Sequence, residues 1–484
     1  MHILFAASEC VPFAKTGGLA DVVGALPQEL VRMGHRVTVY LPLYRQVASQ
    51  LAERRYAIRS LTIPFRYYNR FVGIVEGGVR NGVEFYFVEC PEMFDREYLY
   101  GAPSGDYEDN WERYGLFARA VIEASKVLGV PDIYHVHDWQ GGMLPVYLRT
   151  TYAADPLLYR AGAVMTIHNA GYQTHFPSQT TEKLLLPWEI FTMDRVEQFD
   201  GFNFLKGGIV YSDEITTVSR RYAEEIQTPE FGFALDGLLR SRAADLVGIV
   251  NGVDYADWDP ARDPSIAAHY TAERLEGKSL CRRDLLHALG AAHIAETTPV
   301  FGIVSRMVTQ KGFDLLADAA ERLLERDLVL LVLGSGEPYY ENLLTGLASR
   351  RPDKVFVKIG YDNVLAHKVE AGSDLFLMPS RYEPCGLNQI YSLRYGTVPV
   401  VHATGGLDDT VEAWNGAEKT GTGFKFSEYS ADALLNSIEE AMRVFSDKDA
   451  WRVLMRNGMA QEFSWKRPAR EYEKVYNEVL RRRS

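Results

Sequence analysis

Residues 378–399 read MPSRYEPCGLNQIYSLRYGTVP, and this stretch decides the predicted fold. The apolar run DLFLM leads into it and predicts a buried strand that ends at Met378. Two prolines and Gly386 then predict a loop, after which the pattern becomes helical. A strand, a polar loop and a helix start in this order present backbone N–H groups that suit a phosphate, with Glu383 beside them to accept hydrogen bonds from sugar hydroxyls. We therefore expect an α/β domain that holds an anion and a polyol.

The same alternation of strand and helix extends through both halves of the chain. In the C-terminal half, further strands are predicted at residues 300–304, 328–333, 355–359 and 398–401. In the N-terminal half, strands are predicted at residues 2–7, 36–41, 61–65, 71–76, 83–88, 133–136, 163–167, 214–218 and 247–250. Of these, the three between residues 61 and 88 are typical of hairpins inserted in the sheet. The remaining βα alternation predicts two doubly wound parallel sheets.

One local misfit lies in the first predicted helix, where Leu19, Val22, Val23, Leu26 and Leu30 follow helical spacing. A proline at position 27 falls inside this pattern, and we expect it to kink the helix or divide it in two.

The division into domains follows from a change of composition after residue 255. Trp, Asp and Pro crowd the next turn-rich stretch, which leads into a polar helical piece. We therefore predict an N-terminal domain at 1–255, a linker region at 256–298, a C-terminal nucleotide-binding domain at 299–465 and a last helix at 466–484.

Composition limits the classes of function. The chain of 484 residues is 47% hydrophobic and 24% charged, which is typical of a globular protein with two or three domains. Its net charge of −12 argues against nucleic acid as the main partner. The four cysteines lie far apart without metal-ligand spacing, and neither a signal segment nor a membrane span is indicated, so we expect a cytoplasmic protein. Nothing in the sequence indicates an oligomeric state.

Two loops carry the residues expected to bind phosphate. Arg306 and Lys311 follow the predicted strand at 300–304, at the edge of the sheet where ligands of parallel sheets bind. The glycine-rich turn from Lys15 to Gly18 precedes a helix, but it matches neither common nucleotide-binding motif and is weak evidence alone. A pattern GGLxDxV occurs at residues 17–23 and again at 405–411, which suggests loops of the two domains that meet across a cleft.

Two other kinds of site remain open at this point. Residues 133–139, IYHVHDW, and 166–169, TIHN, end predicted strands in histidines 135, 137 and 168. These could bind a metal, although buried hydrogen-bonded histidines are the commoner explanation. Cys385 precedes a helix and could be a nucleophile, although no histidine base lies near it in the sequence.

Several motifs together resemble one family. They are KTGGLADVVGALP, HVHDW, TIHN, FLKGGIVYSDEITTVS, IVNGVD, VSRMVTQKG, SRYEPCGLNQIYSLRYG and TGGLDDTV, in this order along nearly the whole chain. This set is similar to the bacterial glycogen synthases and plant starch synthases. The resemblance implies a GT-B fold, with two Rossmann-like domains, a deep cleft between them and a C-terminal helix that crosses back to the N-terminal domain. It also implies transfer of glucose from ADP-glucose to the non-reducing end of an α-1,4-glucan such as glycogen, with retention of the anomeric configuration.

The resemblance also implies roles for single residues. Arg306 and Lys311 would bind the diphosphate and stabilise the leaving ADP, and Glu383 would hold the glucose. His168 and Asp138 would line the reacting centre. The residues expected to contact the donor are Lys15, Gly17, Gly18, Asp21, Tyr361, Cys385, Gly386, Leu387 and Asn388. Neither a metal nor another cofactor is expected, because cationic side chains and helix N-termini carry the charge.

This chain departs from related patterns at three points. Tyr391 stands where many retaining GT-B enzymes have a second glutamate, HDWQGG replaces HDWH, and Asn388 replaces a threonine. No residue decides between adenine and uracil as the donor base. An epimerase of nucleotide sugars and a glucan-binding protein without activity remain alternatives, whereas an NAD oxidoreductase is disfavoured because neither domain opens with GxGxxG.

Overall fold

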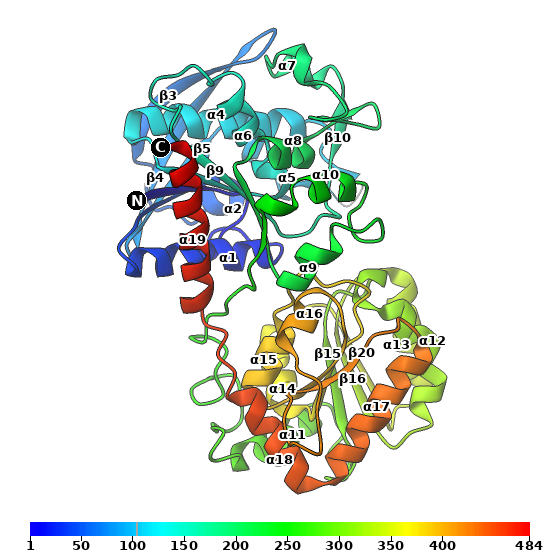
Figure 1. Cartoon of the computed structure of the whole chain (residues 1–484). Coiled ribbons are helices and arrows are strands. Elements are labelled where there is room, and N and C mark those ends of the chain that lie inside the picture. The colour runs from blue at the N-terminus through cyan, green and yellow to red at the C-terminus, as the bar shows by residue number, and fades with distance from the viewer. Residues whose placement is uncertain (103–104) are drawn as a thin grey trace. The chain divides into compact units, whose positions relative to one another are not determined.

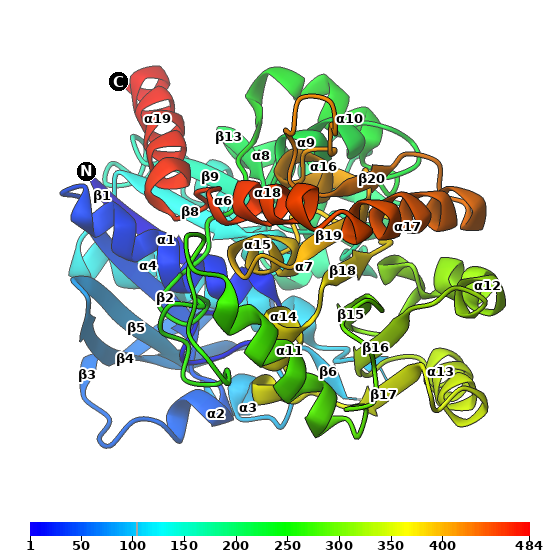
Figure 2. The same ribbon diagram turned by 90° about the horizontal axis from the view of Figure 1, so that it is seen from below.

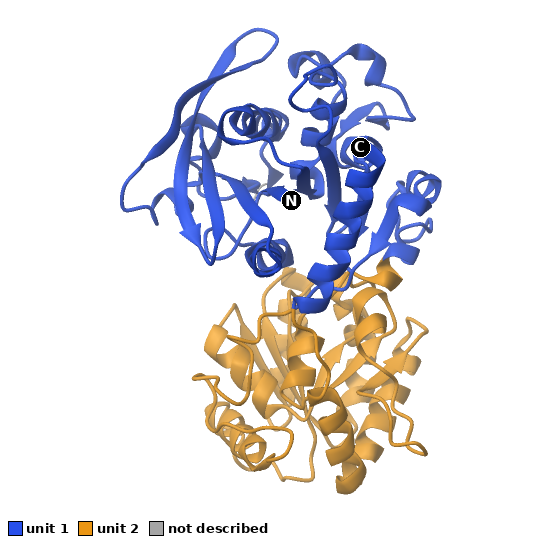
Figure 3. Cartoon of the chain, turned by 60° about the vertical axis from the view of Figure 1, so that its left-hand side comes forward, with its two compact units in different colours: residues 1–218, 223–252, 465–484 blue, residues 219–222, 253–464 orange. Residues whose placement is uncertain are grey.

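The computed structural model describes residues 1–102 and 105–484, which form two compact units. Unit 1 comprises Met1–Val218, Ala223–Gly252 and Trp465–Ser484, and unit 2 comprises Ser219–Tyr222 and Val253–Ser464 (Figure 3). No helix in this described part of the chain is both long and apolar enough to cross a membrane.

Unit 1 is built on a nine-stranded sheet with the order β14-β13-β9-β8-β1-β2-β5-β4-β3 (Figure 1). Its strands are β1 (His2–Ala6), β2 (Arg36–Pro42), β3 (Tyr56–Pro64), β4 (Asn69–Arg80), β5 (Val83–Glu89), β8 (Ile133–His137), β9 (Gly162–Ile167), β13 (Glu214–Thr217) and β14 (Leu246–Gly248). Pairing is parallel from β14 to β5, and antiparallel between β5, β4 and β3. The remaining short strands are β6 (Gly101–Ala102), β7 (Gly105–Asp106), β10 (His175–Pro177), β11 (Glu197–Gln198) and β12 (Gly201–Asn203).

The predicted hairpins at the edge of this sheet are confirmed. The turn between β4 and β5 is Asn81-Gly82, and both residues have positive φ, 50° and 81°. Such a turn matches the twist of two antiparallel strands, and asparagine and glycine adopt it at least cost. The central strands β1 and β8 are almost wholly buried, because helices and loops cover both faces of a parallel sheet.

Helices surround the sheet of unit 1. They are α1 (Gly18–Arg32), α2 (Arg45–Ala48), α3 (Pro91–Phe94), α4 (Asn110–Leu128), α5 (Asp138–Gly141), α6 (Met143–Arg149), α7 (Thr180–Lys183), η1 (Trp188–Ile190), α8 (Phe204–Tyr211), α10 (Asp236–Ser241), η2 (Ala243–Asp245) and α19 (Lys466–Arg483), while α9 (Arg220–Glu225) begins in unit 2. The expected division at Pro27 does not occur, because α1 is one helix that runs through it. Beside the proline, the amide of Gln28 donates to the carbonyl of Gly24 at 2.6 Å.

The last helix, α19, belongs to unit 1, where it packs on α1 and β9. Its attachment is polar as well as apolar. The hydroxyl of Tyr476 lies 2.9 Å from Nδ1 of His135, and Arg483 pairs with Asp213 at 2.6 Å. The chain thus returns to its first unit after completing the second.

Unit 2 contains a six-stranded parallel sheet with the order β17-β16-β15-β18-β19-β20. Its strands are β15 (Val300–Val304), β16 (Val329–Gly334), β17 (Val355–Ile359), β18 (Leu375–Met378), β19 (Val398–His402) and β20 (Phe424–Phe426). Its helices are α11 (Glu276–Ala288), η3 (Thr309–Lys311), α12 (Phe313–Leu324), α13 (Pro338–Arg350), α14 (Asn363–Gly372), α15 (Asn388–Arg394), α16 (Gly405–Thr410), α17 (Ala431–Ser446) and α18 (Lys448–Met459).

Alternate residues of one strand show how this sheet is covered. Leu330 and Val332 of β16 pack in the apolar cluster that includes α12, α13 and α17, whereas Leu331 packs with Leu285 of α11 and Val369 of α14. Successive side chains of a strand point to opposite faces, so helices cover both. Both faces being apolar explains why the strands are continuous hydrophobic runs.

The segment at 256–298, which we expected to be a linker, is part of unit 2. Its helix α11 packs along α14 (Figure 2). Upstream, the indole of Trp258 stacks between His367 at 3.8 Å and Tyr391 at 4.3 Å, with interplanar angles of 7° and 9°. Buried aromatic stacking of this kind fixes the segment to the domain instead of leaving it free.

Candidate active site

The predicted site residues gather at the carboxyl ends of parallel strands in each unit. In unit 2, β15 leads to Arg306 and Lys311, β17 to Tyr361, and β18 to Glu383. In unit 1, β1 leads to the loop with Lys15, β8 to Asp138 and β9 to His168. This edge is where open α/β sheets bind ligands, because loops and helix starts converge there.

The strongest contact within the predicted set joins Lys311 and Glu383. Nζ of Lys311 lies 2.5 Å from Oε2 of Glu383, and these side chains are 20% and 6% exposed. The hydroxyl of Ser380 donates to the same oxygen at 3.1 Å. The cation expected to hold phosphate and the carboxylate expected to hold sugar are therefore neighbours, although 72 residues separate them in the chain.

Glycines allow the loops of unit 2 to approach each other this closely. Gly312 has φ of +79°, and a Cβ there would lie 2.0 Å from the carbonyl oxygen of Pro379. A Cβ on Gly405, φ +45°, would lie 2.0 Å from the carbonyl oxygen of Glu383, and one on Gly406 equally close to that of Cys385. The amide of Gly406 donates to the carbonyl of Glu383 at 3.0 Å. Backbone packing therefore holds residues 383–385 in place.

The residues after Glu383 form the turn into α15. Cys385 is buried, Gly386 has φ of +73°, and Leu387 is the residue that precedes the helix. The side-chain amide of Asn388 donates to the carbonyl of Val304 at 2.6 Å, which ties the helix start to the end of β15. The asparagine found in place of threonine thus has a structural role.

The two other predicted residues of unit 2 are exposed. Arg306 lies in the loop after β15, and its guanidinium donates to Oε1 of Gln310 at 3.4 Å. Tyr361 is 75% exposed, and its hydroxyl donates to Asn363 at 2.8 Å. Both side chains are therefore accessible to a ligand.

In unit 1, the glycine-rich turn is open around its backbone. Lys15 pairs with Asp21 at 2.7 Å, and burial raises the pKa of Asp21 while Lys15 opposes that shift. A Cβ built on Gly17 or Gly18 would have no neighbour within 4 Å among the described residues outside its own helix and chain neighbours. Because α1 begins at Gly18, the turn leads directly into a helix start, where backbone N–H groups suit an anion.

The second predicted group in unit 1 joins Asp138 and His168. Oδ1 of Asp138 accepts a hydrogen bond from the backbone N–H of His168 at 2.7 Å. Asp138 has φ of +49°, a strained conformation for a residue with a side chain, and strain of this kind is often found at functional sites. Burial raises its pKa to about 7, so that its charge changes near neutral pH.

The three histidines of the sequence motifs lie in a row. Ring centroids of His135 and His137 are 4.4 Å apart, and Nδ1 of His137 lies 3.0 Å from Nε2 of His168. Burial lowers the pKa of each, to about 3 for His135 and His168, so all three are neutral at pH 7. Within residues 1–102 and 105–484, no three His, Cys, Asp or Glu side chains are grouped as a metal site would require.

Three residues that contact the predicted site residues or their neighbours were not predicted from the sequence. Ser380 contacts Glu383, and Nδ1 of His402 in turn donates to the carbonyl of Ser380 at 2.8 Å. In unit 1, the carboxylate of Glu9 contacts the backbone of the glycine-rich turn. Their positions just after predicted strands were the available signal, but serine, histidine and glutamate are common in loops.

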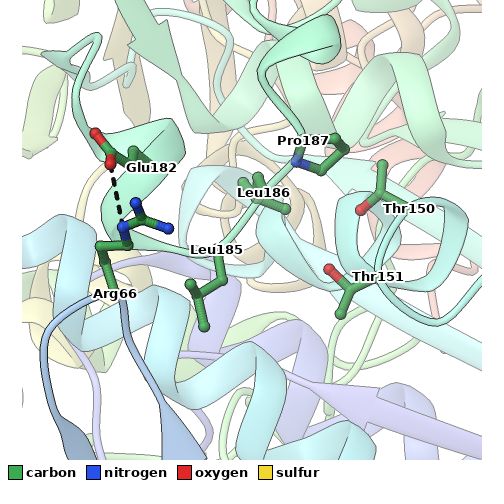
Figure 4. A pocket seen from close by; sticks show the side chains of 7 residues that line it. All are labelled: Arg66, Thr150, Thr151, Glu182, Leu185, Leu186 and Pro187. Carbon is green, nitrogen blue, oxygen red and sulfur yellow. Dashed lines mark ion pairs between the residues drawn. The ribbon is translucent and has the colours of Figure 1, made fainter.

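A separate pocket of about 450 Å³ lies on unit 1 (Figure 4). Its lining consists of Arg66, Thr150, Thr151, Glu182, Leu185, Leu186 and Pro187. Arg66 and Glu182 form an ion pair at 3.1 Å. A second pocket, of about 650 Å³, lies on unit 2 between α11, β17 and α14. Neither pocket is lined by a predicted site residue, so we assign the candidate active site to the carboxyl ends of the strands.

The chain is similar to known proteins along most of its length. Residues 2–241 match the family model of the starch synthase catalytic domain, and residues 290–451 match that of group 1 glycosyl transferases. A glycogen synthase of Koribacter versatilis is 56% identical, over 99% of this chain and 98% of that protein. Glycogen synthase 1 of Geobacter sulfurreducens is 45% identical, over 100% and 97%.

A solved structure extends the likeness to three dimensions. The catalytic domain of starch synthase IV from Arabidopsis thaliana, bound to ADP and acarbose, matches with a TM-score of 0.89 and 31% identity, over 99% of both chains. The predicted GT-B fold is confirmed by this match. The chain belongs to the family of bacterial glycogen synthases and plant starch synthases, and it is a hexosyltransferase.

Proposed function

We propose that this enzyme transfers glucose from ADP-glucose to the 4-hydroxyl at the non-reducing end of an α-1,4-glucan, with retention of configuration. The observation that carries the proposal is the pair of Lys311 and Glu383 at the carboxyl edge of a parallel sheet. A cation beside a buried carboxylate provides one group for a phosphate oxygen and one for sugar hydroxyls. The ADP bound to the Arabidopsis relative supports adenine as the base.

The cationic side chains promote departure of the leaving group. As the bond from the anomeric carbon to the phosphate oxygen breaks, negative charge grows on the ADP. Lys311 stabilises this charge, as does Arg306, whose side chain is exposed. Lys15 and the turn at Gly17 and Gly18 also bind phosphate, through the ammonium of Lys15 and the backbone N–H of Gly18, in the open space around that turn.

Glu383 orients the glucose, and the backbone of Cys385, Gly386 and Leu387 surrounds it. In this proposal the thiol of Cys385 is not a nucleophile, since the residue is held at a crowded backbone crossing with Gly406. The acceptor hydroxyl attacks on the face from which the phosphate leaves, and the departing phosphate takes its proton. Asp138 and His168 line the acceptor side, Asn388 supports the helix start, and Tyr361 stacks near the base. Asp21 holds Lys15 in place.

We also propose that the reaction needs no metal or other cofactor, because Arg306 and Lys311 supply positive charge to the phosphates. A rate unchanged by EDTA is the expected outcome. We further propose a cytoplasmic location, which is supported by the absence of a disulfide among the four cysteines of the described chain.

The test is incorporation of radiolabelled glucose into glycogen, with ADP-glucose and UDP-glucose in separate reactions. We expect transfer from ADP-glucose, a product that an exo-acting α-1,4-glucan hydrolase degrades, and little transfer from UDP-glucose. A preference for UDP-glucose would contradict the donor. A free sugar epimer without chain growth, or no transfer from either donor, would contradict the reaction.

A further inference from the structure

The carboxylate of Glu9 binds the backbone of the glycine-rich turn in unit 1. Glu9 follows β1 and is 4% exposed. Its Oε2 accepts hydrogen bonds from the N–H of Thr16 and from the N–H of Gly17, the latter at 3.1 Å. Its Oε1 accepts from the hydroxyl of Thr16 at 2.6 Å and from that of Tyr100 at 2.5 Å. The two oxygens thus join the turn to a buried tyrosine.

This arrangement supplies a constraint that the turn itself lacks. Gly17 is extended, with φ of −152° and ψ of −170°, and α1 starts at the next residue. Two consecutive glycines have wide conformational freedom, and a Cβ built on either would meet no described atom within 4 Å outside its own helix and chain neighbours. Hydrogen bonds from backbone N–H groups to a carboxylate are among the stronger ones in proteins, particularly where water is excluded. Glu9 is therefore the group that sets the path of residues 15–17.

The same carboxylate acts on the second predicted group of unit 1. The pKa of Asp138 is raised mainly by burial, and the negative charge of Glu9 adds to this shift.

We propose that Glu9 is a positioning residue for the transfer reaction: its carboxylate holds the turn at Lys15–Gly18 in the shape that receives the donor phosphates. This inference rests on the proposed function. A different role of Glu9 would change the strength of donor binding in the opposite direction. If Glu9 merely occupied the amides until a phosphate displaced it, removing its charge would strengthen donor binding.

Glu9→Gln tests the proposal, because glutamine keeps the shape but loses the charge and one of the two acceptor oxygens. We expect the KM for ADP-glucose to rise about tenfold, as for loss of a charge-assisted hydrogen bond, while the KM for glycogen changes less than about twofold. The acid limb of the pH–rate profile should move to lower pH, since the carboxyl of Asp138 loses a negative neighbour. Glu9→Asp, which keeps the charge, should retain the wild-type limb.

Glu89→Gln is the matched control. Glu89 also lies in unit 1, and its carboxylate also accepts a hydrogen bond from a tyrosine hydroxyl, that of Tyr56 at 2.7 Å. Its other partner is Arg54, which is not a predicted site residue. Its variant should match the wild type in both KM and pH profile. Thermal unfolding of both variants separates misfolding from loss of positioning. If Glu9→Gln does not fold, Tyr100→Phe removes one hydroxyl from the carboxylate, and its donor KM should still rise.

The outcomes separate the inference from the function on which it rests. A wild-type enzyme without transfer activity would contradict the proposed function. An active wild type with a folded Glu9→Gln variant of equal or lower donor KM would contradict the positioning role alone, as would an unchanged donor KM in Tyr100→Phe.

Discussion

The two copies of GGLxDxV have the same sequence pattern but different surroundings. At Gly17 and Gly18, a Cβ would enter space that no described residue occupies outside the adjacent chain and helix. At Gly405 and Gly406, a Cβ would lie 2.0 Å from a backbone oxygen of residue 383 or 385. The first pair keeps room beside a helix start, and the second lets two loops pack. The same sequence pattern therefore leaves space beside the backbone in unit 1 and permits close backbone packing in unit 2.

The largest effect should come from the cation that the second pair of glycines helps to place. Lys311→Ala should lower kcat about 10²- to 10³-fold, as for removal of a group that stabilises charge in the transition state. Initial rates with saturating ADP-glucose measure the loss. The control is Lys425→Ala, since Lys425 is also 20% exposed and also pairs with a carboxylate, that of Asp408. A rate for Lys311→Ala near that of the control would show that the phosphate assignment is wrong.

Next in size is the effect of filling the packed glycine. Gly406→Ala should lower the free energy of unfolding by about 1–3 kcal/mol, because the new methyl group displaces the backbone of Cys385. Denaturant titration measures it, with Gly416→Ala as the control, where the nearest atom would be 3.4 Å from the Cβ. Equal free energies of unfolding for the two variants would contradict the structural role of Gly406.

For Gly18, which lies in open space, we expect substitution to affect activity and not stability. Gly18→Ala should leave the free energy of unfolding within about 0.5 kcal/mol of the wild type, because the position is helical and uncrowded. Its kcat/KM for ADP-glucose should fall about tenfold, since the methyl group occupies the space of the donor phosphates. Full activity with unchanged stability would mean that the space receives no ligand.

The smallest effect concerns the pH dependence of Asp138. Its pKa is raised to about 7 in the folded protein from an ordinary value near 3.8. Protonation therefore favours the folded state, and this contribution to stability is lost as pH rises from about 4 through 7. Activity that needs the carboxylate should rise severalfold over the upper part of this range.

Asp138→Asn isolates this group from other buried acids, such as Glu370, whose pKa burial raises to about 8. At high pH the wild type carries a buried charge that the variant lacks, which lowers its free energy of unfolding relative to the variant. Towards low pH the wild-type carboxyl becomes neutral, so this difference in unfolding free energy should narrow or reverse. The variant should also lack the rise in rate. A wild-type minus variant difference that does not change between pH 5 and 8 would contradict the shift.

Much of the site was predictable because parallel strands bring their carboxyl ends to one edge. The strand before Arg306 and the strand before Glu383 could be recognised from apolar runs, and the edge rule then placed both residues together. Their direct ion pair could not be foreseen, because it depends on side chains 72 positions apart. The unbroken helix through Pro27 was missed, because packing of an amphipathic helix overrides a local preference.

The sequence by itself determined the alternation of strands and helices, the family motifs and the residue types at each strand end, because these follow from local periodicity and spacing. Contacts between distant segments place residues 256–298 on unit 2, and they place α19 on unit 1, as the family resemblance implied. Only the tertiary structure decided which glycines are crowded and that Glu9 serves the turn at Gly17. These features depend on contacts between segments that are distant in the sequence, and local sequence patterns do not predict such contacts.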